Sequence, residues 1–125
     1  AQRAPSQLRQ SASVEAARAL LVEHYHEPLQ LEDVASAAGI SPFHLCRLFK
    51  RSTGLPIHRY LTRLRLATAL ERVVEGCTDL ADLAFELGFS SHSHLSSAFR
   101  KELGLAPSEV RRQTEPSRPR RQLGR

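Results

Sequence analysis

The side chains that could do chemistry lie in two similar stretches, SPFHLCRLFKRS from Ser41 and SSHSHLSSAFRKEL from Ser90. Each stretch combines short polar or aromatic groups with two adjacent cations near its end. Such groups suit nucleic acid, because a guanidinium can donate to both O6 and N7 of guanine, and Lys and Arg bind phosphates. The chemistry these residues indicate is recognition of a polyanion.

No pattern typical of an enzyme or a metal site is present. His92 and His94 are two residues apart, which on a helix points them about 200° away from each other, and the same holds for His24 and His26. We find no glycine-rich phosphate loop, GxSxG elbow or clustered carboxylate pair. We therefore expect no catalysis, no metal and no cofactor.

Cysteine use and composition indicate an intracellular globular domain. Cys46 and Cys77 form no CxxC pattern, which argues against a disulfide framework and a structural zinc site. The 125 residues are 41% hydrophobic and 25% charged, as in an ordinary single domain. No apolar run approaches the roughly 20 residues that span a bilayer, and the N-terminus lacks the apolar core of a signal peptide. We expect a cytoplasmic protein.

The charge balance favours an acidic partner. The net charge is +5, and all 18 cations except Lys50 and Lys101 are Arg. Arg grips phosphates and guanine edges with a planar fork, whereas Lys supplies a point charge. A GC-rich coding sequence is an alternative explanation for part of the Arg excess.

Helical periodicity dominates the chain and predicts an all-α fold. The expected helices cover 13–27, 31–38, 42–53, 56–75, 80–87, 90–103 and 107–113. Ser41, Asp79 and Ser90 supply start signals, and Gly39, Gly54, Gly88 and Gly104 supply stops. In the longest helix we expect one buried stripe, formed by Tyr60, Leu61, Leu64, Ala67, Leu70 and Val74. The domain is expected over 13–113, with a linker remnant at 1–12 and a flexible basic tail at 114–125.

Two segments repeat one another. Leu31, Asp33, Ala35, Gly39 and Ser41 lie 49 positions before Leu80, Asp82, Ala84, Gly88 and Ser90, whereas Phe49 and Gly54 lie 50 before Phe99 and Gly104. The second copy has thus gained one residue near the start of its second helix. Two helices joined by a tight glycine turn form the helix-turn-helix pattern, expected at about 31–52 and 79–103.

The connecting helix, at about 56–75, gives the duplication a geometric purpose. It would span roughly 30 Å, close to the 34 Å or so between successive major-groove faces of B-DNA. A single chain could then place two recognition helices in adjacent grooves and read an asymmetric site as a monomer.

The stretches LEDVASAAGISPFHLCRLFKRSTGLPIHRYLTRLRLATAL and DLADLAFELGFSSHSHLSSAFRKELGLAPSEVRR resemble the AraC/XylS transcription regulators. The resemblance implies seven helices in two helix-turn-helix subdomains joined by a long linker helix, with double-stranded DNA as the partner. It also implies a separate ligand-sensing or dimerising domain, so we expect this chain to be an excised C-terminal domain. The alternative explanation for a first residue of Ala1 is removal of an initiator Met. RNA polymerase is a candidate further partner.

On the first recognition helix, the face opposite Leu45, Leu48 and Phe49 presents the expected base-reading residues, which are Phe43, His44, Cys46 and Arg47. Arg47 is the strongest candidate because its planar guanidinium can form two hydrogen bonds to a guanine edge. The resemblance supports this, since family members commonly contact bases at this position. The alternative is that Arg47 binds a phosphate. The resemblance places a base-contacting aromatic at Phe43, which could instead cover the turn.

On the second recognition helix, the candidates are short or weakly charged: His92, Ser93, Ser96 and Ser97. Where the family often has an Arg, this chain has Ser97, so we expect weaker sequence reading from this half. The expected phosphate-binding residues are Lys50, Arg51, Arg100, Lys101 and Arg111. A basic helical module that binds an acidic protein is the rival interpretation.

Overall fold

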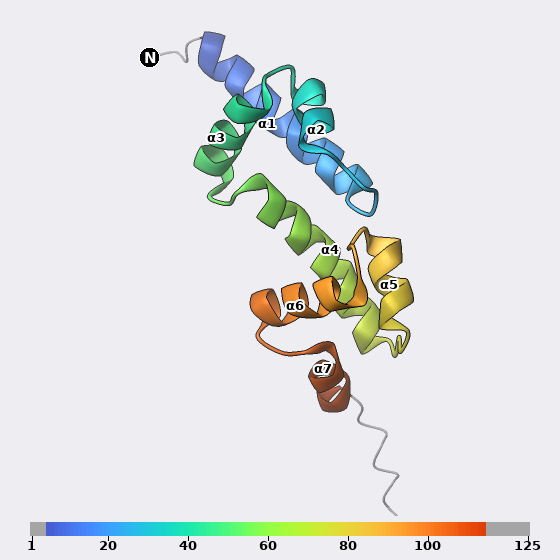
Figure 1. Cartoon of the computed structure of the whole chain (residues 1–125). Helices are drawn as coiled ribbons and strands as arrows, with labels where there is room; N and C mark the ends of the chain where they lie inside the picture. Colours follow the sequence, from blue (N-terminus) through green and yellow to red (C-terminus); the bar gives the residue numbers. More distant parts are fainter. Residues whose placement is uncertain (1–4, 115–125) are drawn as a thin grey trace, which may run out of the picture. The chain divides into compact units, whose positions relative to one another are not determined.

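The computed structural model describes residues 5–114, which contain seven α-helices and no strand (Figure 1). The helices are α1 (Pro5–His24), α2 (Leu31–Ala38), α3 (Pro42–Thr53), α4 (Ile57–Val74), α5 (Leu80–Leu87), α6 (His92–Leu103) and α7 (Pro107–Gln113). The all-α prediction is confirmed. The chain divides into a first unit, residues 1–65, and a second unit, residues 66–125, with the boundary inside α4.

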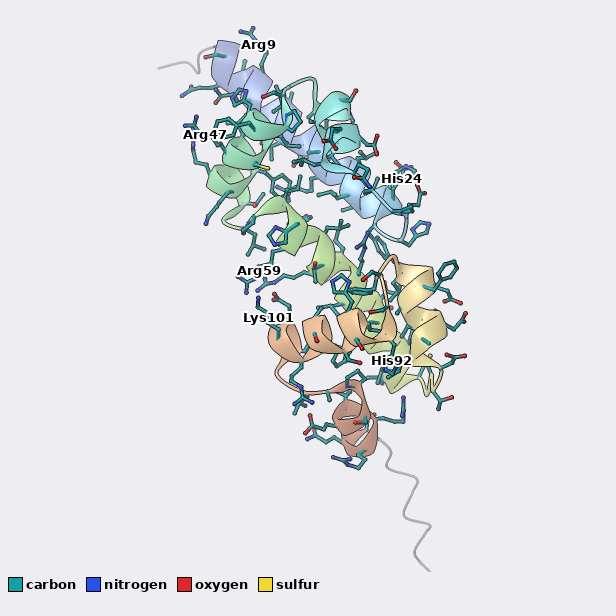
Figure 2. The ribbon with its side chains drawn as sticks, viewed as in Figure 1. Arg9, His24, Arg47, Arg59, His92 and Lys101 are labelled. Atoms are coloured by element: carbon teal, nitrogen blue, oxygen red, sulfur yellow. The ribbon has the colours of Figure 1, made fainter. Side chains whose placement is uncertain are left out.

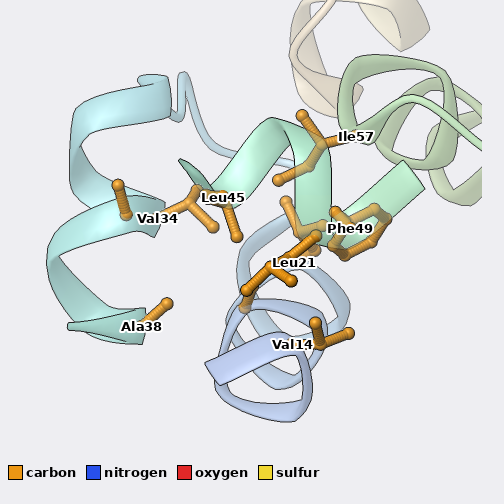
Figure 3. Close-up of a cluster of buried hydrophobic side chains, with 10 residues drawn as sticks. Val14, Leu21, Val34, Ala38, Leu45, Phe49 and Ile57 are labelled. Atoms are coloured by element: carbon orange, nitrogen blue, oxygen red, sulfur yellow. The ribbon is translucent and has the colours of Figure 1, made fainter. Parts of the chain in front are cut away.

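The first unit has a core made by one face of each of its helices. Figure 3 shows its buried side chains, which come from α1 (Val14, Leu21), α2 (Val34, Ala38), α3 (Leu45, Phe49) and the start of α4 (Ile57). Each large side chain removed from water contributes roughly 1.5–3 kcal/mol. Tyr60 packs its ring edge-on against Phe49, at 5.1 Å between centroids. The apolar spacing of α1, α2 and α3 correctly predicted these buried faces.

The second unit uses equivalent positions. Its buried apolar residues come from α5 (Leu83, Ala84, Leu87), α6 (Leu95, Phe99), α7 (Val110), the later part of α4 (Leu66, Ala69, Val73) and Phe89 in the turn after α5. Each unit therefore holds one of the two repeated helices, α3 or α6, on its own core.

The predicted start and stop signals act as expected with one exception. Ser41 Oγ accepts from the His44 amide at 3.1 Å, and Asp79 Oδ1 accepts from the Asp82 amide at 2.9 Å. Gly39 and Gly88 end α2 and α5 with φ of 74° and 92°, in the left-handed region that side chains with a Cβ avoid.

The exception is the start of α6, where the prediction that Ser90 begins the helix is wrong. Ser91 is the N-cap, and its Oγ accepts from the His94 amide at 3.0 Å. Ser90 instead donates its amide to His94 Nδ1 at 3.3 Å. The residue that the second copy has gained therefore lies in the turn, and α3 and α6 correspond at a spacing of 50 along their whole length.

α1 also differs from the sequence prediction, because it begins at Pro5 rather than near Ser13 and ends at His24. Residues 5–12 of the expected linker remnant are thus helical, and residues 1–4 lie outside the described part. Five of the seven residues in 6–12 are good helix formers (Gln, Leu, Arg and Ala), but the segment has no apolar stripe. Hydrophobic periodicity therefore does not detect this part of the helix. Of the expected basic tail, Thr114 is the exposed C-cap of α7 and residues 115–125 are outside the described range.

The single stripe expected along α4 is incorrect. Ala67 and Val74 are exposed, whereas Leu66, Ala69 and Val73 are buried. Earlier in the helix, Ile57, Tyr60, Leu61 and Leu64 contribute to the core of the first unit. Because each half of α4 packs in a different unit, its buried face changes partway along the helix.

Candidate nucleic-acid interface

α3 has a buried apolar face and an opposite, accessible face that is mostly polar. Leu45, Leu48 and Phe49 are buried. On the other face, Phe43, His44, Arg47, Lys50 and Arg51 are exposed and Cys46 is half-buried. The structure thus brings the sequence-predicted residues of this helix together on one accessible surface.

α6 repeats the arrangement with different chemistry. Its exposed face carries His92, Ser93, Ser97, Arg100 and Lys101, and Ser96 is half-buried. A shallow surface hollow on α3 is lined by Cys46, Arg47, Lys50 and Arg51. The hollow on α6 is lined by Ser93 and by the four residues equivalent to these, which are Ser96, Ser97, Arg100 and Lys101. The two helices therefore present the same positions, but only α3 has a guanidinium in the middle of its face.

Arg47 and Phe43 contact each other on the exposed face of α3. The guanidinium carbon of Arg47 lies over the Phe43 ring, 5.8 Å from its centroid, within the range of a cation–π interaction. The two residues are four apart, the spacing of neighbours on a helix surface. Phe43 is 73% exposed, so its ring is accessible on this face.

The charge around α3 is not balanced by nearby acids in the sequence. Residues 34–70 contain no Asp or Glu, although they include Arg47, Lys50, Arg51, Arg59, Arg63 and Arg65. By contrast, Glu86 and Glu102 lie before and within α6. This gap in acidic residues is a signal of local charge that is visible in the sequence itself.

Two arginines have structural partners inside their own units. Arg65 is 8% exposed and donates to the carbonyl oxygens of Tyr25 and Glu27, at 2.6 and 3.0 Å. Burial lowers the pKa of Arg65, although an Arg remains protonated at neutral pH. This role of Arg65 could not be predicted from the sequence, because the fold alone brings the loop carbonyl oxygens beside its guanidinium.

The other is Arg111, a predicted phosphate-binding residue. It is half-buried, and its NH2 group donates to the Cys77 carbonyl oxygen at 2.6 Å. The structure therefore sets Arg111 apart from Lys50, Arg51, Arg100 and Lys101, whose side chains are all exposed.

Other types of site receive no support from the described residues. Between residues 5 and 114, no group of three or more His, Cys, Asp or Glu side chains is placed to hold a metal ion. No helix in this range is both long and apolar enough to cross a membrane.

Sequence comparison finds relatives over most of the chain. The protein-family model described as a helix-turn-helix domain matches residues 34–113. The transcriptional activator RhaS of Escherichia fergusonii is 37% identical over 93 residues, which are 74% of this chain and 34% of that protein. The chain thus spans about a third of the length of this relative.

Solved structures share the fold. The C-terminal domain of AraT, a response regulator from Geobacillus stearothermophilus, has a TM-score of 0.77 at 30% identity, covering 84% of this chain and 88% of that one. The DNA-binding domain of the global transcriptional factor AdpA, solved in complex with a target DNA, has a TM-score of 0.76 at 27% identity. That match covers 86% of this chain and 96% of the other.

Proposed function

Because this chain belongs to the AraC/XylS family of helix-turn-helix transcription regulators, we propose that it binds a specific double-stranded DNA site and thereby regulates transcription. In this proposal, α3 and α6 enter successive major grooves. The observation that carries it is the exposed face of α3, where Phe43, Cys46, Arg47, Lys50 and Arg51 gather over a buried apolar face.

The roles on α3 follow from side-chain chemistry. Arg47 can donate two parallel hydrogen bonds to a guanine edge, a contact that discriminates by roughly 1–3 kcal/mol. Phe43 can pack against a thymine methyl group, while His44 and Cys46 border the same groove. Lys50 and Arg51, at the end of the helix, bind backbone phosphates, which position the helix without reading sequence.

The second unit contributes less sequence information in this proposal. The short side chains of Ser93, Ser96 and Ser97 reach less far toward base edges than a guanidinium does. His92 discriminates weakly between bases in this proposal. Arg100 and Lys101 bind phosphates. The unit then acts mainly through the shape and backbone of its half of the site.

The proposal that α3 and α6 enter adjacent grooves is supported by α4, which is one continuous helix. Its 18 residues correspond to about 27 Å at 1.5 Å per residue, against about 34 Å between successive major-groove faces. One chain therefore suffices for a two-part site, and we expect it to bind as a monomer. Dimerisation and contact with RNA polymerase would belong to the intact regulator, and DNA binding would place it in the cytoplasm.

Selection of binding sites from a random duplex library tests the function directly. We expect enrichment of one asymmetric sequence, with tighter binding to it than to a scrambled duplex of the same length and salt concentration. Absence of enrichment would contradict the proposal and would favour the rival, an interaction module for an acidic protein.

A further inference from the structure

The first turns of α1 extend beyond the part of the helix that packs in the core. Ser6, Gln7, Leu8 and Arg9 are exposed, and the first buried side chain of α1 is Val14. A helix end of this length is marginal by itself in water. Core packing therefore does not explain why the chain carries it.

α3 lies next to this extension on both sides of Leu48. One surface hollow is lined by Arg9 and Gln10 of α1 together with His44 and Leu48 of α3. A second is lined by Gln7 and Gln10 of α1 together with Leu48, Arg51 and Ser52 of α3. The extension thus borders α3 beside His44 near its start and beside Arg51 near its end.

The extension is basic and polar. Residues 5–14 contain no Asp or Glu, and Arg9 forms no ion pair with any residue in the described part of the chain. By contrast, Arg18 of the same helix is paired with Glu15 at 3.3 Å. Figure 2 shows Arg9 near the beginning of α1 and Arg47 on the neighbouring α3.

We propose that the start of α1 is a flank of the DNA interface, in which Arg9 binds a backbone phosphate beside the bases that α3 reads. This inference rests on the proposed function. The ligand is a phosphodiester rather than a base, because Arg9 lies across a hollow from His44 and not on the central face of α3 around Arg47. Gln10, which lines both hollows, offers a further donor along the same backbone.

The decisive experiment pairs Arg9→Ala with duplexes of the selected site in which single phosphates are replaced by neutral methylphosphonates. Arg and Ala are both good helix formers, so this substitution leaves α1 intact. We expect Arg9→Ala to weaken binding about three- to tenfold on specific and random duplexes alike, and to reduce the salt slope by about 0.9. At one flanking phosphate, neutralisation should weaken wild-type binding but not that of Arg9→Ala.

Two control variants isolate the charge. Arg9→Lys should restore most of the affinity and the salt slope, and Leu8→Ala, an exposed neutral change one residue away, should bind like the wild type. If the wild type binds its selected site tightly but Arg9→Ala has unchanged affinity and salt slope, this inference is overturned while the proposed function stands. If the wild-type chain prefers no sequence, both are overturned.

Discussion

The guanidinium of Arg47 lies over the ring of Phe43, 5.8 Å from the ring centroid, on the exposed face of α3. The aromatic ring limits the orientations open to a long, exposed side chain. An ordered guanidinium loses less entropy when it forms two hydrogen bonds to one base. We therefore propose that Phe43 orients Arg47 in addition to its proposed contact with a thymine methyl group.

Replacing Arg47 tests the base-reading role. Arg47→Ala should cost about 1–3 kcal/mol on the selected site and relax base preference at one position, because a bidentate contact is lost. Fluorescence anisotropy with duplexes that vary one base pair at a time measures both effects. Equal losses on specific and random DNA would assign Arg47 to phosphate binding instead.

A double-mutant cycle tests the orientation of Arg47 by Phe43. If the ring orders the guanidinium, Phe43→Ala should cost less in the Arg47→Ala background than in the wild type, with a coupling of about 0.5–1 kcal/mol. The same binding assay supplies all four affinities. Additive losses would mean that the two residues act independently. Phe43→Leu is a control that keeps apolar contact but removes the ring.

Arg100 should behave differently from Arg47. Arg100→Ala removes an exposed cation at the end of α6, so we expect weaker binding to every sequence and a salt slope reduced by about 0.9. Titrations of the selected and the scrambled duplex at several salt concentrations measure this. A loss confined to the selected duplex would make Arg100 a base reader, and Arg100→Lys should retain the salt slope.

Ser97 offers a gain of function, because it is the position equivalent to Arg47. Ser97→Arg should create a new preference for guanine in the half-site facing α6, worth roughly 1–3 kcal/mol against other bases. Repeating the site selection with the variant reveals it. Ser97→Lys is the matched control, since it adds charge without the planar fork. If both variants only tighten binding uniformly, α6 does not present this position to bases.

Arg65 should matter for stability. Arg65→Met fills a similar volume but leaves the carbonyl oxygens of Tyr25 and Glu27 without their donor, which we expect to cost about 2–4 kcal/mol of unfolding free energy. Urea unfolding followed by circular dichroism measures the loss. His58→Ala, an exposed change on the same helix, should stay within about 0.5 kcal/mol of the wild type. An Arg65→Met variant as stable as the wild type would contradict the structural role.

The sequence predicted the fold well wherever a local rule decides the structure. Gly39 and Gly88 fix turns that need positive φ, Ser41 and Asp79 cap helices through short side chains, and the apolar spacing of α3 defines its buried face. These signals depend on neighbours within a few residues. They therefore remain readable without knowledge of tertiary structure.

The failed prediction of one stripe along α4, and the missed partners of Arg65 and Arg111, depend on contacts between distant segments. The buried face of α4 changes because the two halves of the helix pack in two separate cores. No local sequence signal marks the boundary between Arg65 and Leu66. Arg65 and Arg111 each donate to a carbonyl oxygen more than 30 positions away in the sequence, at Tyr25 and Cys77, so local spacing does not reveal these contacts. The candidate site itself was predictable, because it follows from the face that α3 and α6 do not bury.

The measurement that tests the central claim most directly is hydroxyl-radical footprinting of the selected site, combined with the stoichiometry of the complex. We predict two non-identical protected blocks, centred about 10 base pairs apart and bound by a single chain. A single protected block, or two chains on a palindromic site, would contradict reading by two recognition helices of one monomer.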